Sequence, residues 1–273
     1  MKQVLQKLLE HETLSKDEAI EIIFKISEGK INNSQLAAFM TVFMMRPVTV
    51  DELTGFRDAL MELCVKISFD EETIDVCGTG GDGKNTFNIS TLSAFVVAGA
   101  GVKVAKHGNY GASSVSGSSN VLEFFGYKFS NDQSVLKTQL EKNNLCFMHA
   151  PFFHPALKHV GPVRKELGLK TFFNMLGPLV NPANPKNRMI GVYSRELART
   201  YNYILQPSAF NYAIVNSDDG YDEISLTSDF SLFSHNGEAR KSPAMFAKEK
   251  IVQKDIFGGE TIEDAAKIFK IIL

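Results

Sequence analysis

The feature that most constrains this chain is a glycine-rich turn that directly follows a short apolar strand. Residues 73–77 have the β-branched pattern of a buried strand and run straight into GTGGDGKNT at 78–86. Four glycines within 78–83 allow tight backbone turns. They also leave backbone N–H groups open to one anion, which side chains would otherwise obstruct. A phosphate group is the natural ligand of such a turn.

Two well-known phosphate loops share part of this pattern, and each fails at one point. Residues 78–84 fit the first seven positions of a P-loop, but Asn85 stands where Ser or Thr should hold magnesium. The spacing Gly-x-Gly-x-x-Gly also fits a dinucleotide fingerprint. However, no helix clearly begins at its third glycine, and the next strand ends at Lys106 instead of a ribose-binding acid. The remaining alternative is a glycine-rich surface turn without a ligand.

The arrangement of apolar residues divides the chain into a helical part and an alternating part. Up to about residue 66, capping boxes at Ser15 and Thr49 and a stop before Pro47 indicate short helices. Beyond it, β-branched runs alternate with helices. We predict a small all-helical domain plus a larger α/β domain with a mostly parallel central sheet flanked by helices. The predicted strands are 73–77, 102–105, 145–149, 189–193 and 212–216, and the later helices are 91–100, 120–125, 134–143, 155–167, 196–205 and 262–273.

The expected domain division places 1–66 in the helical domain, joined by roughly 151–180. The α/β domain then comprises 67–150 and 181–273 and carries the phosphate and metal loops. A cleft between two closely packed domains is the default place for a ligand.

Composition excludes several classes of function. With 29 basic and 31 acidic residues the net charge is -2, so the surface is not built mainly for nucleic acid or an anionic membrane, and anion binding must be local. The three cysteines show no C-x-x-C spacing, which argues against a disulfide framework or a zinc ribbon. No targeting or membrane-spanning segment is evident, and we expect a cytoplasmic protein.

Further anion-binding turns follow the next strand positions. Asn88, Ile89, Ser90 and Thr91 lie where a helix begins, and helix N-termini offer free N–H donors. The run 106–109 follows the next strand, and the serine-rich run 113–119 leads into another helix. Because the carboxyl ends of parallel strands meet at one edge of a sheet, these turns predict a single elongated anion.

An acidic turn, DDGYDE at 218–223, follows the strand at 212–216. Neighbouring carboxylates repel each other unless a cation lies between them or they face water, and Mg2+ with phosphate oxygens suits such ligands. A solvated acidic turn is the alternative. The spacing does not fit an EF-hand, and the histidines at 149, 154 and 159 do not share a helix face for zinc. No G-x-S-x-G segment signals a serine hydrolase.

A single arginine, Arg164, precedes a segment rich in Phe, Gly and Pro at 171–182. Its planar fork suits a carboxylate, and the segment could form a flat slot for an aromatic ring. Alternatively, Arg164 is a surface residue whose stem merely covers apolar neighbours.

Taken in order, four stretches closely resemble the anthranilate phosphoribosyltransferase family. They are GTGGDGKNTFNIST, VAKHGNYGASSVSGSSNVLEFFG, HPALKHVGPVRKELGLKTFFNMLGPLVNP and DGYDEISL. The resemblance covers nearly the whole chain. It implies a homodimer formed through the helical domain. It also implies a Mg2+-dependent transfer of phosphoribose from 5-phosphoribosyl 1-diphosphate to anthranilate, with release of pyrophosphate.

The resemblance also implies roles for individual residues. His107, Asn109 and Arg164 would position the substrates, and no residue would act as a nucleophile. Anthranilate would lie against Gly78, His107, Asn109, Arg164 and Gly177, and the metal would be held by Ser90, Asp222 and Glu223. The phosphoribosyl diphosphate would be bound by Gly78, Gly81, Asp82, Thr86, Asn88, Ile89, Ser90, Thr91, Lys106, Ser113, Ser114 and Ser118.

The chain departs from the family pattern at two places. Tyr110 stands where many relatives have arginine, and relatives usually continue beyond the helix at 262–273, so we expect a C-terminally shortened chain.

Two alternatives from other classes are a pyrimidine nucleoside phosphorylase-like enzyme and a noncatalytic homologue that binds nucleic acid. The paired acids, the Arg164 segment and the near-neutral charge favour the transferase, which would bind no nucleic acid and no membrane.

Overall fold

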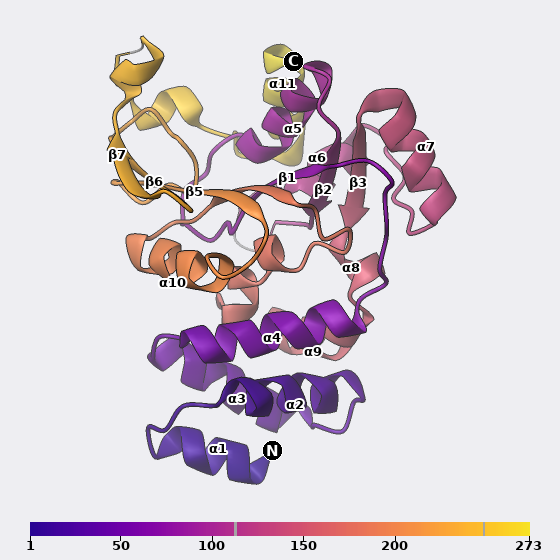
Figure 1. Cartoon of the computed structure of the whole chain (residues 1–273), viewed down its shortest axis with the longest axis vertical. Helices are drawn as coiled ribbons and strands as arrows, with labels where there is room; N and C mark the ends of the chain where they lie inside the picture. The colour runs from indigo at the N-terminus through magenta and orange to yellow at the C-terminus, as the bar shows by residue number, and fades with distance from the viewer. Residues whose placement is uncertain (112–113, 248) are drawn as a thin grey trace.

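The N-terminal part of the protein forms four helices stacked at one end of the molecule (Figure 1). The computed structural model describes residues 1–111, 114–247 and 249–273. The two predicted capping boxes are present, because Ser15 and Thr49 each accept a hydrogen bond from the backbone three residues later. The helices are α1 (Lys2–Leu9), which the sequence did not single out, α2 (Lys16–Ser27), α3 (Asn33–Met45) and α4 (Val50–Leu63).

The rest of the chain is built around a seven-stranded sheet with the order β3-β2-β1-β4-β5-β6-β7. The first five strands pair in parallel, and β6 and β7 add an antiparallel edge, which confirms the predicted fold class. The strands are β1 (Ile74–Gly78), β2 (Val104–Gly108), β3 (Leu145–His149), β4 (Asn187–Gly191), β5 (Asn211–Ser217), β6 (Phe230–Ser234) and β7 (Gly237–Lys241).

All five predicted strands form, although β2 and β4 are displaced along the chain by about two residues from the ranges predicted. The β6–β7 hairpin was not predicted. Its local signal is weak: alternation in FSLFS and the turn residues His235 and Asn236 between the strands. The buried strands could thus be read from the sequence, but the short edge hairpin could not.

Helices cover both sides of the sheet (Figure 1), with α5 and α11 on one side and α10 on the other. The later α-helices are α5 (Ile89–Gly99), α6 (Ser118–Phe124), α7 (Gln133–Asn143), α8 (Ala150–Phe153), α9 (Val160–Leu167), α10 (Arg195–Leu205) and α11 (Ile262–Ile272). Short 3-10 turns are η1 (Pro155–His159), η2 (Phe172–Met175), η3 (Gly177–Leu179), η4 (Pro243–Phe246) and η5 (Gln253–Ile256).

The prediction of a single helix at 155–167 is wrong in one respect, because the structure divides this range into η1 and α9. Pro162 explains the division. It has no N–H to donate to the carbonyl four residues earlier, so a regular α-helix beginning at residue 155 would lack that bond. After the break, α9 carries Arg164 to the cleft described below.

The segment that follows α9 packs into the core of the N-terminal helices. The Phe172 ring lies 4.6 Å from that of Phe56, 5.0 Å from Phe43 and 5.8 Å from Phe39, measured between centroids. The same buried cluster continues through η3 to β4, β5 and α10. The segment between α9 and β4 therefore connects the helical part to the sheet through a continuous apolar core.

In the parts of the chain that the structure describes, no helix combines the length and the apolar character needed to cross a bilayer.

Candidate active site

The cleft lies at the carboxyl ends of the central parallel strands and has a volume of about 270 Å³. It is lined by turns that follow β1, β2 and β5 and by the segment from α9 to η3. Ser113, one of the predicted phosphate residues, lies outside the described residues. All the other predicted site residues line this one cleft: Gly78, Gly81, Asp82, Thr86, Asn88, Ile89, Ser90, Thr91, Lys106, His107, Asn109, Ser114, Ser118, Arg164, Gly177, Asp222 and Glu223.

The glycine-rich turn uses its glycines for conformation as well as for space. Gly80, Gly81 and Gly83 have φ values of 60°, 78° and 76°, in the left-handed region that side chains with a β-carbon disfavour. The Gly80 N–H donates to the Asp222 carboxylate across 2.6 Å. This bond joins the turn after β1 to the acidic turn after β5, two segments separated by about 140 residues in the sequence.

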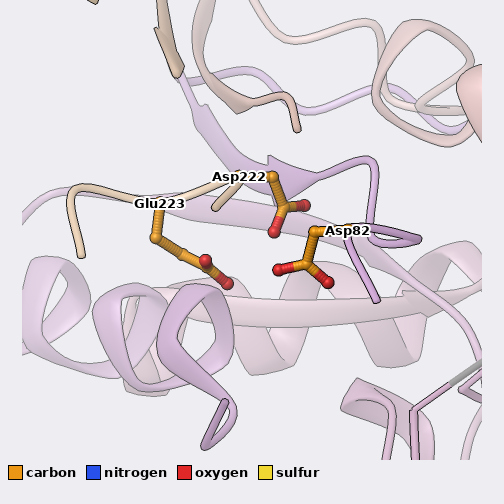
Figure 2. A group of neighbouring side chains, drawn as sticks. All are labelled: Asp82, Asp222 and Glu223. Carbon is orange, nitrogen blue, oxygen red and sulfur yellow. The ribbon is translucent and has the colours of Figure 1, made fainter. Parts of the chain in front are cut away.

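An acidic cluster lies at this junction. Figure 2 shows the carboxylates of Asp82, Asp222 and Glu223 gathered from these two turns, and one oxygen of each lies within 4.8 Å of the others. Burial and the charge of Asp222 raise the pKa of Asp82 to about 6. Burial raises the pKa of Asp222, and burial with the charges of Asp222 and Asp82 raises that of Glu223 well above its usual range.

This cluster fits a hard divalent cation. Asp82 Oδ2 and Glu223 Oε2 are buried with no hydrogen-bond partner among the described residues. Oxygen ligands of this kind suit Mg2+, and a bound cation would offset the mutual repulsion that raises these pKa values. Asp82, predicted as a diphosphate ligand, thus lies among the acids, and Ser90, which lines the same cleft, accepts from Lys106 Nζ at 3.4 Å.

The other phosphate candidates form a polar wall around Lys106. Lys106 is buried, with 2% of its surface exposed, and its ammonium donates to the Val76 carbonyl at 2.5 Å. Asn88 Nδ2 donates to the Ser116 carbonyl at 3.0 Å, which ties the start of α5 to the serine-rich turn. Thus a buried cation, a helix N-terminus and hydroxyl groups face one volume, as an extended anion requires.

The opposite side of the cleft holds two buried histidines. His107 Nδ1 lies 3.1 Å from the Gly177 carbonyl, His154 Nε2 lies 2.8 Å from the Val180 carbonyl, and the two rings are 5.3 Å apart. Burial lowers the pKa of His107 to about 4, and burial with the neighbouring His107 lowers that of His154 to about 3. Both imidazoles are therefore neutral at pH 7, and each donates to a carbonyl of the segment around the Gly-Pro turn.

Arg164 is fixed in place by residues of η2. Its guanidinium donates to Asn174 Oδ1 at 3.0 Å and lies 5.8 Å from the centre of the Phe173 ring. Arg164 Nε is buried with no partner among the described residues. A preorganised, partly unpaired guanidinium beside an aromatic ring can bind the carboxylate of an aromatic acid.

Several residues of the cleft were not predicted as site residues. Asn174 orients Arg164, and Lys84 places its ammonium 4.7 Å from the centre of the Tyr221 ring. Lys84 stood out in the sequence only as part of an incomplete P-loop. Tyr110 is 42% exposed at the cleft, packs edge-on against His149 at 4.8 Å and donates to Glu123 at 3.3 Å. A neutral phenol therefore occupies the position at which arginine is common in the resembling family.

The protein combines a helical domain with an α/β domain, which is the domain pair of the Glycosyl transferase family. Residues 2–64 match the helical bundle domain of the Glycosyl transferase family, and residues 70–272 match its a/b domain. The chain is 57% identical over 274 residues to the anthranilate phosphoribosyltransferase of Christiangramia forsetii and 56% identical to that of Flavobacterium johnsoniae. Each alignment covers 100% of this chain and 83% of the relative. The chain belongs to the anthranilate phosphoribosyltransferase family.

Solved structures agree with this assignment. Anthranilate phosphoribosyltransferase from Thermus thermophilus superposes with a TM-score of 0.87 at 31% identity, covering 97% of this chain and 80% of that one. The Saccharomyces cerevisiae enzyme in complex with PRPP and Mg superposes with a TM-score of 0.88 at 28% identity, covering 98% of this chain and 79% of that one.

Proposed function

We propose that this protein transfers the 5-phosphoribosyl group from 5-phosphoribosyl 1-diphosphate to the amine of anthranilate in tryptophan biosynthesis, releasing pyrophosphate. One observation carries the proposal: a single cleft joins the glycine-rich turn and the acidic cluster to a pocket that contains Arg164 and the neutral His107. A diphosphate sugar and an aromatic acid would therefore meet in that cleft. The S. cerevisiae relative has been crystallised with PRPP and Mg, and also with 4-fluoroanthranilate.

The diphosphate end of the cleft would use backbone donors and one metal ion. The N–H groups of the glycine-rich turn, the N-terminus of α5 and the Lys106 ammonium would hold the phosphate oxygens. Asp222 and Glu223 are proposed Mg2+ ligands together with Ser90, which the resemblance implies, and Asp82 lies close enough to the two acids to join them. When bound, Mg2+ would stabilise the charge that develops on departing pyrophosphate.

The acceptor needs to be positioned but does not need a base. The amine of anthranilate is neutral near pH 7, so its nitrogen can attack the ribose carbon while the bond to pyrophosphate breaks, and the proton that the new C–N bond makes acidic then passes to water or to the departing pyrophosphate. Arg164, held by Asn174, would bind the anthranilate carboxylate, and Asn109 and His107 would line the same pocket. Holding the two substrates in this alignment lowers the activation barrier, because their translational and rotational freedom is already lost on binding.

We also propose the assembly and location that the resemblance implies. A homodimer through the helical domain is supported by Leu9 and Met45, apolar side chains that are 71% and 84% exposed on α1 and α3. The packing of Phe172 on the N-terminal helices supports a helical domain of 1–66 joined by roughly 151–180. The free state of Cys64, Cys77 and Cys146 supports the cytoplasm as the location.

The deciding experiment mixes the protein with anthranilate, 5-phosphoribosyl 1-diphosphate and Mg2+ and follows the loss of anthranilate fluorescence. We expect the fluorescence to decay only when all three are present. Release of uracil from uridine and phosphate, with no use of anthranilate, would instead favour a nucleoside phosphorylase. A salt-sensitive DNA mobility shift without any turnover would favour a nucleic-acid-binding module.

A further inference from the structure

Lys170, an exposed residue of the segment that follows α9, reaches the glycine-rich turn. It lies between α9 and η2, only two residues before Phe172, which is anchored in the core of the N-terminal helices. Its ammonium donates to the Gly81 carbonyl at 2.5 Å. A side chain anchored on the helical side of the protein thus holds the backbone of a turn that belongs to the sheet.

The lysine side chain lies along the turn as well as touching it at one point. A β-carbon at Gly81 would lie 3.7 Å from Lys170 Cδ, and one at Gly83 would lie 3.8 Å from Lys170 Nζ. Chain neighbours apart, no other residue within the described ranges comes within 4 Å of these two positions. Lys170 therefore lies against Gly81 and Gly83, whereas Gly80 and Asn85 of the same turn are held by Asp222 and Gly259.

The ammonium also brings positive charge to the acidic side of the cleft. Lys170 and Lys84 both lower the pKa of Asp82, against the larger effects of burial and Asp222, which raise it. The charge of Lys170 therefore acts on Asp82, one of the three carboxylates of the acidic cluster. A positive charge beside this turn would attract the negative charge of a bound diphosphate.

We infer that Lys170 is a positioning residue for the diphosphate donor: it holds the glycine-rich turn in its ligand-binding shape and places a positive charge beside the diphosphate. This inference rests on the proposed function, because it assigns the donor to that turn. The same segment carries the support for the acceptor, since Asn174 accepts from both Arg164 and the Thr171 backbone N–H. The segment that holds Arg164, the proposed anthranilate ligand, thus also contacts the glycine-rich turn through Lys170.

The test compares Lys170→Met, which keeps a long apolar stem, with Lys170→Arg, which keeps the charge and the donor. We expect Lys170→Met to raise the KM for 5-phosphoribosyl 1-diphosphate about ten-fold or more, since a hydrogen bond from a charged group is lost. The KM for anthranilate should change less than about two-fold. Lys170→Arg should restore most of the donor affinity. Lys165→Met is the matched control, because no hydrogen bond or ion pair of the Lys165 side chain occurs within the described residues.

A second readout does not depend on turnover. Amide hydrogen exchange of the peptide spanning 78–86 in the ligand-free protein should be faster in Lys170→Met than in the wild type and in Lys165→Met. Titration with inorganic pyrophosphate and Mg2+ should show the same loss of affinity. Equal exchange and equal donor KM in wild type and Lys170→Met would overturn the inference. Failure of the wild type to consume anthranilate would contradict the proposed function instead, while the exchange result would still decide the role of Lys170 at the turn.

Discussion

Gly191, at the end of β4, lies directly against the backbone carbonyl of Asp222. A β-carbon at Gly191 would overlap that oxygen, and one at Gly78 would lie 2.5 Å from the Asp222 carboxylate. Gly78 and Gly191 are register partners on the adjacent strands β1 and β4. Two strands thus end in glycine side by side, and the space that their missing side chains leave is filled by one acidic residue.

We predict that Gly191→Ala displaces the acidic turn and lowers Mg2+-dependent turnover by at least about ten-fold, with a loss of stability of about 1–3 kcal/mol from overpacking. Activity against Mg2+ concentration and urea denaturation measure the two effects. Gly99→Ala is the control, because a β-carbon at Gly99 meets no atom within 4 Å in the described structure. If Gly191→Ala kept the Mg2+ dependence of the wild type, the conclusion that Gly78 and Gly191 leave the space occupied by Asp222 would be contradicted.

The double substitution Asp222→Asn with Glu223→Gln removes two carboxylates that burial makes costly to ionise. We expect it to abolish metal-dependent turnover while leaving the melting temperature of the metal-free protein unchanged or higher, because the charge repulsion in the cluster is relieved. Mg2+ should stabilise the wild type against heat and leave the variant unaffected. Unchanged activity at limiting Mg2+ would rule out this metal assignment.

Arg164→Ala should weaken saturation by anthranilate more than saturation by the diphosphate donor. The expected loss is about 10- to 100-fold in kcat/KM for anthranilate, the scale for a charge-assisted hydrogen bond. Arg164→Lys should recover little of it, since an ammonium lacks the planar fork and cannot reproduce the contact with Asn174. Steady-state kinetics with each substrate varied in turn decides the matter. A larger effect on the donor would refute the assignment.

The two buried histidines predict acid sensitivity of the fold. His107 and His154 have pKa values lowered from 6.5 to about 4 and about 3, so the unfolded chain binds their protons at a higher pH than the folded protein does. Their contribution to stability is full above pH 6.5 and falls as the pH drops to about 4 for His107 and to about 3 for His154. The loss is about 1 kcal/mol per histidine for each pH unit.

Urea denaturation at pH 7 and pH 5 measures this effect. His154→Gln, which keeps a donor for the Val180 carbonyl, should lose less stability than the wild type between the two pH values. His235→Gln provides the control, because His235 lies in the β6–β7 turn and is exposed, unlike the buried His154. An equal pH dependence in wild type and His154→Gln would show that His154 does not titrate in this way.

Local sequence patterns identified most of the fold, and the reason is that they act over short distances. The capping boxes at Ser15 and Thr49 form between residues three apart, and the buried strands of the parallel sheet are short apolar runs. The β6–β7 hairpin escaped prediction because β7, the strand at the edge of the sheet, is mostly exposed and carries no apolar pattern that would pair it with β6. The division of the helix at 155–167 depended on the hydrogen bond that Pro162 cannot make.

The sequence by itself determined the chemistry of the cleft: a glycine-rich turn, the serine and lysine turns, the paired acids and Arg164 could all be named from order and residue type. Only the tertiary structure decided how these groups meet. Asp82 joins Asp222 and Glu223, Asn174 holds Arg164, and Lys170 supports Gly81, and two of these contacts join residues 89 or more positions apart. Such contacts leave little local pattern, because they depend on the order of the strands in the sheet and on the space left by Gly78 and Gly191.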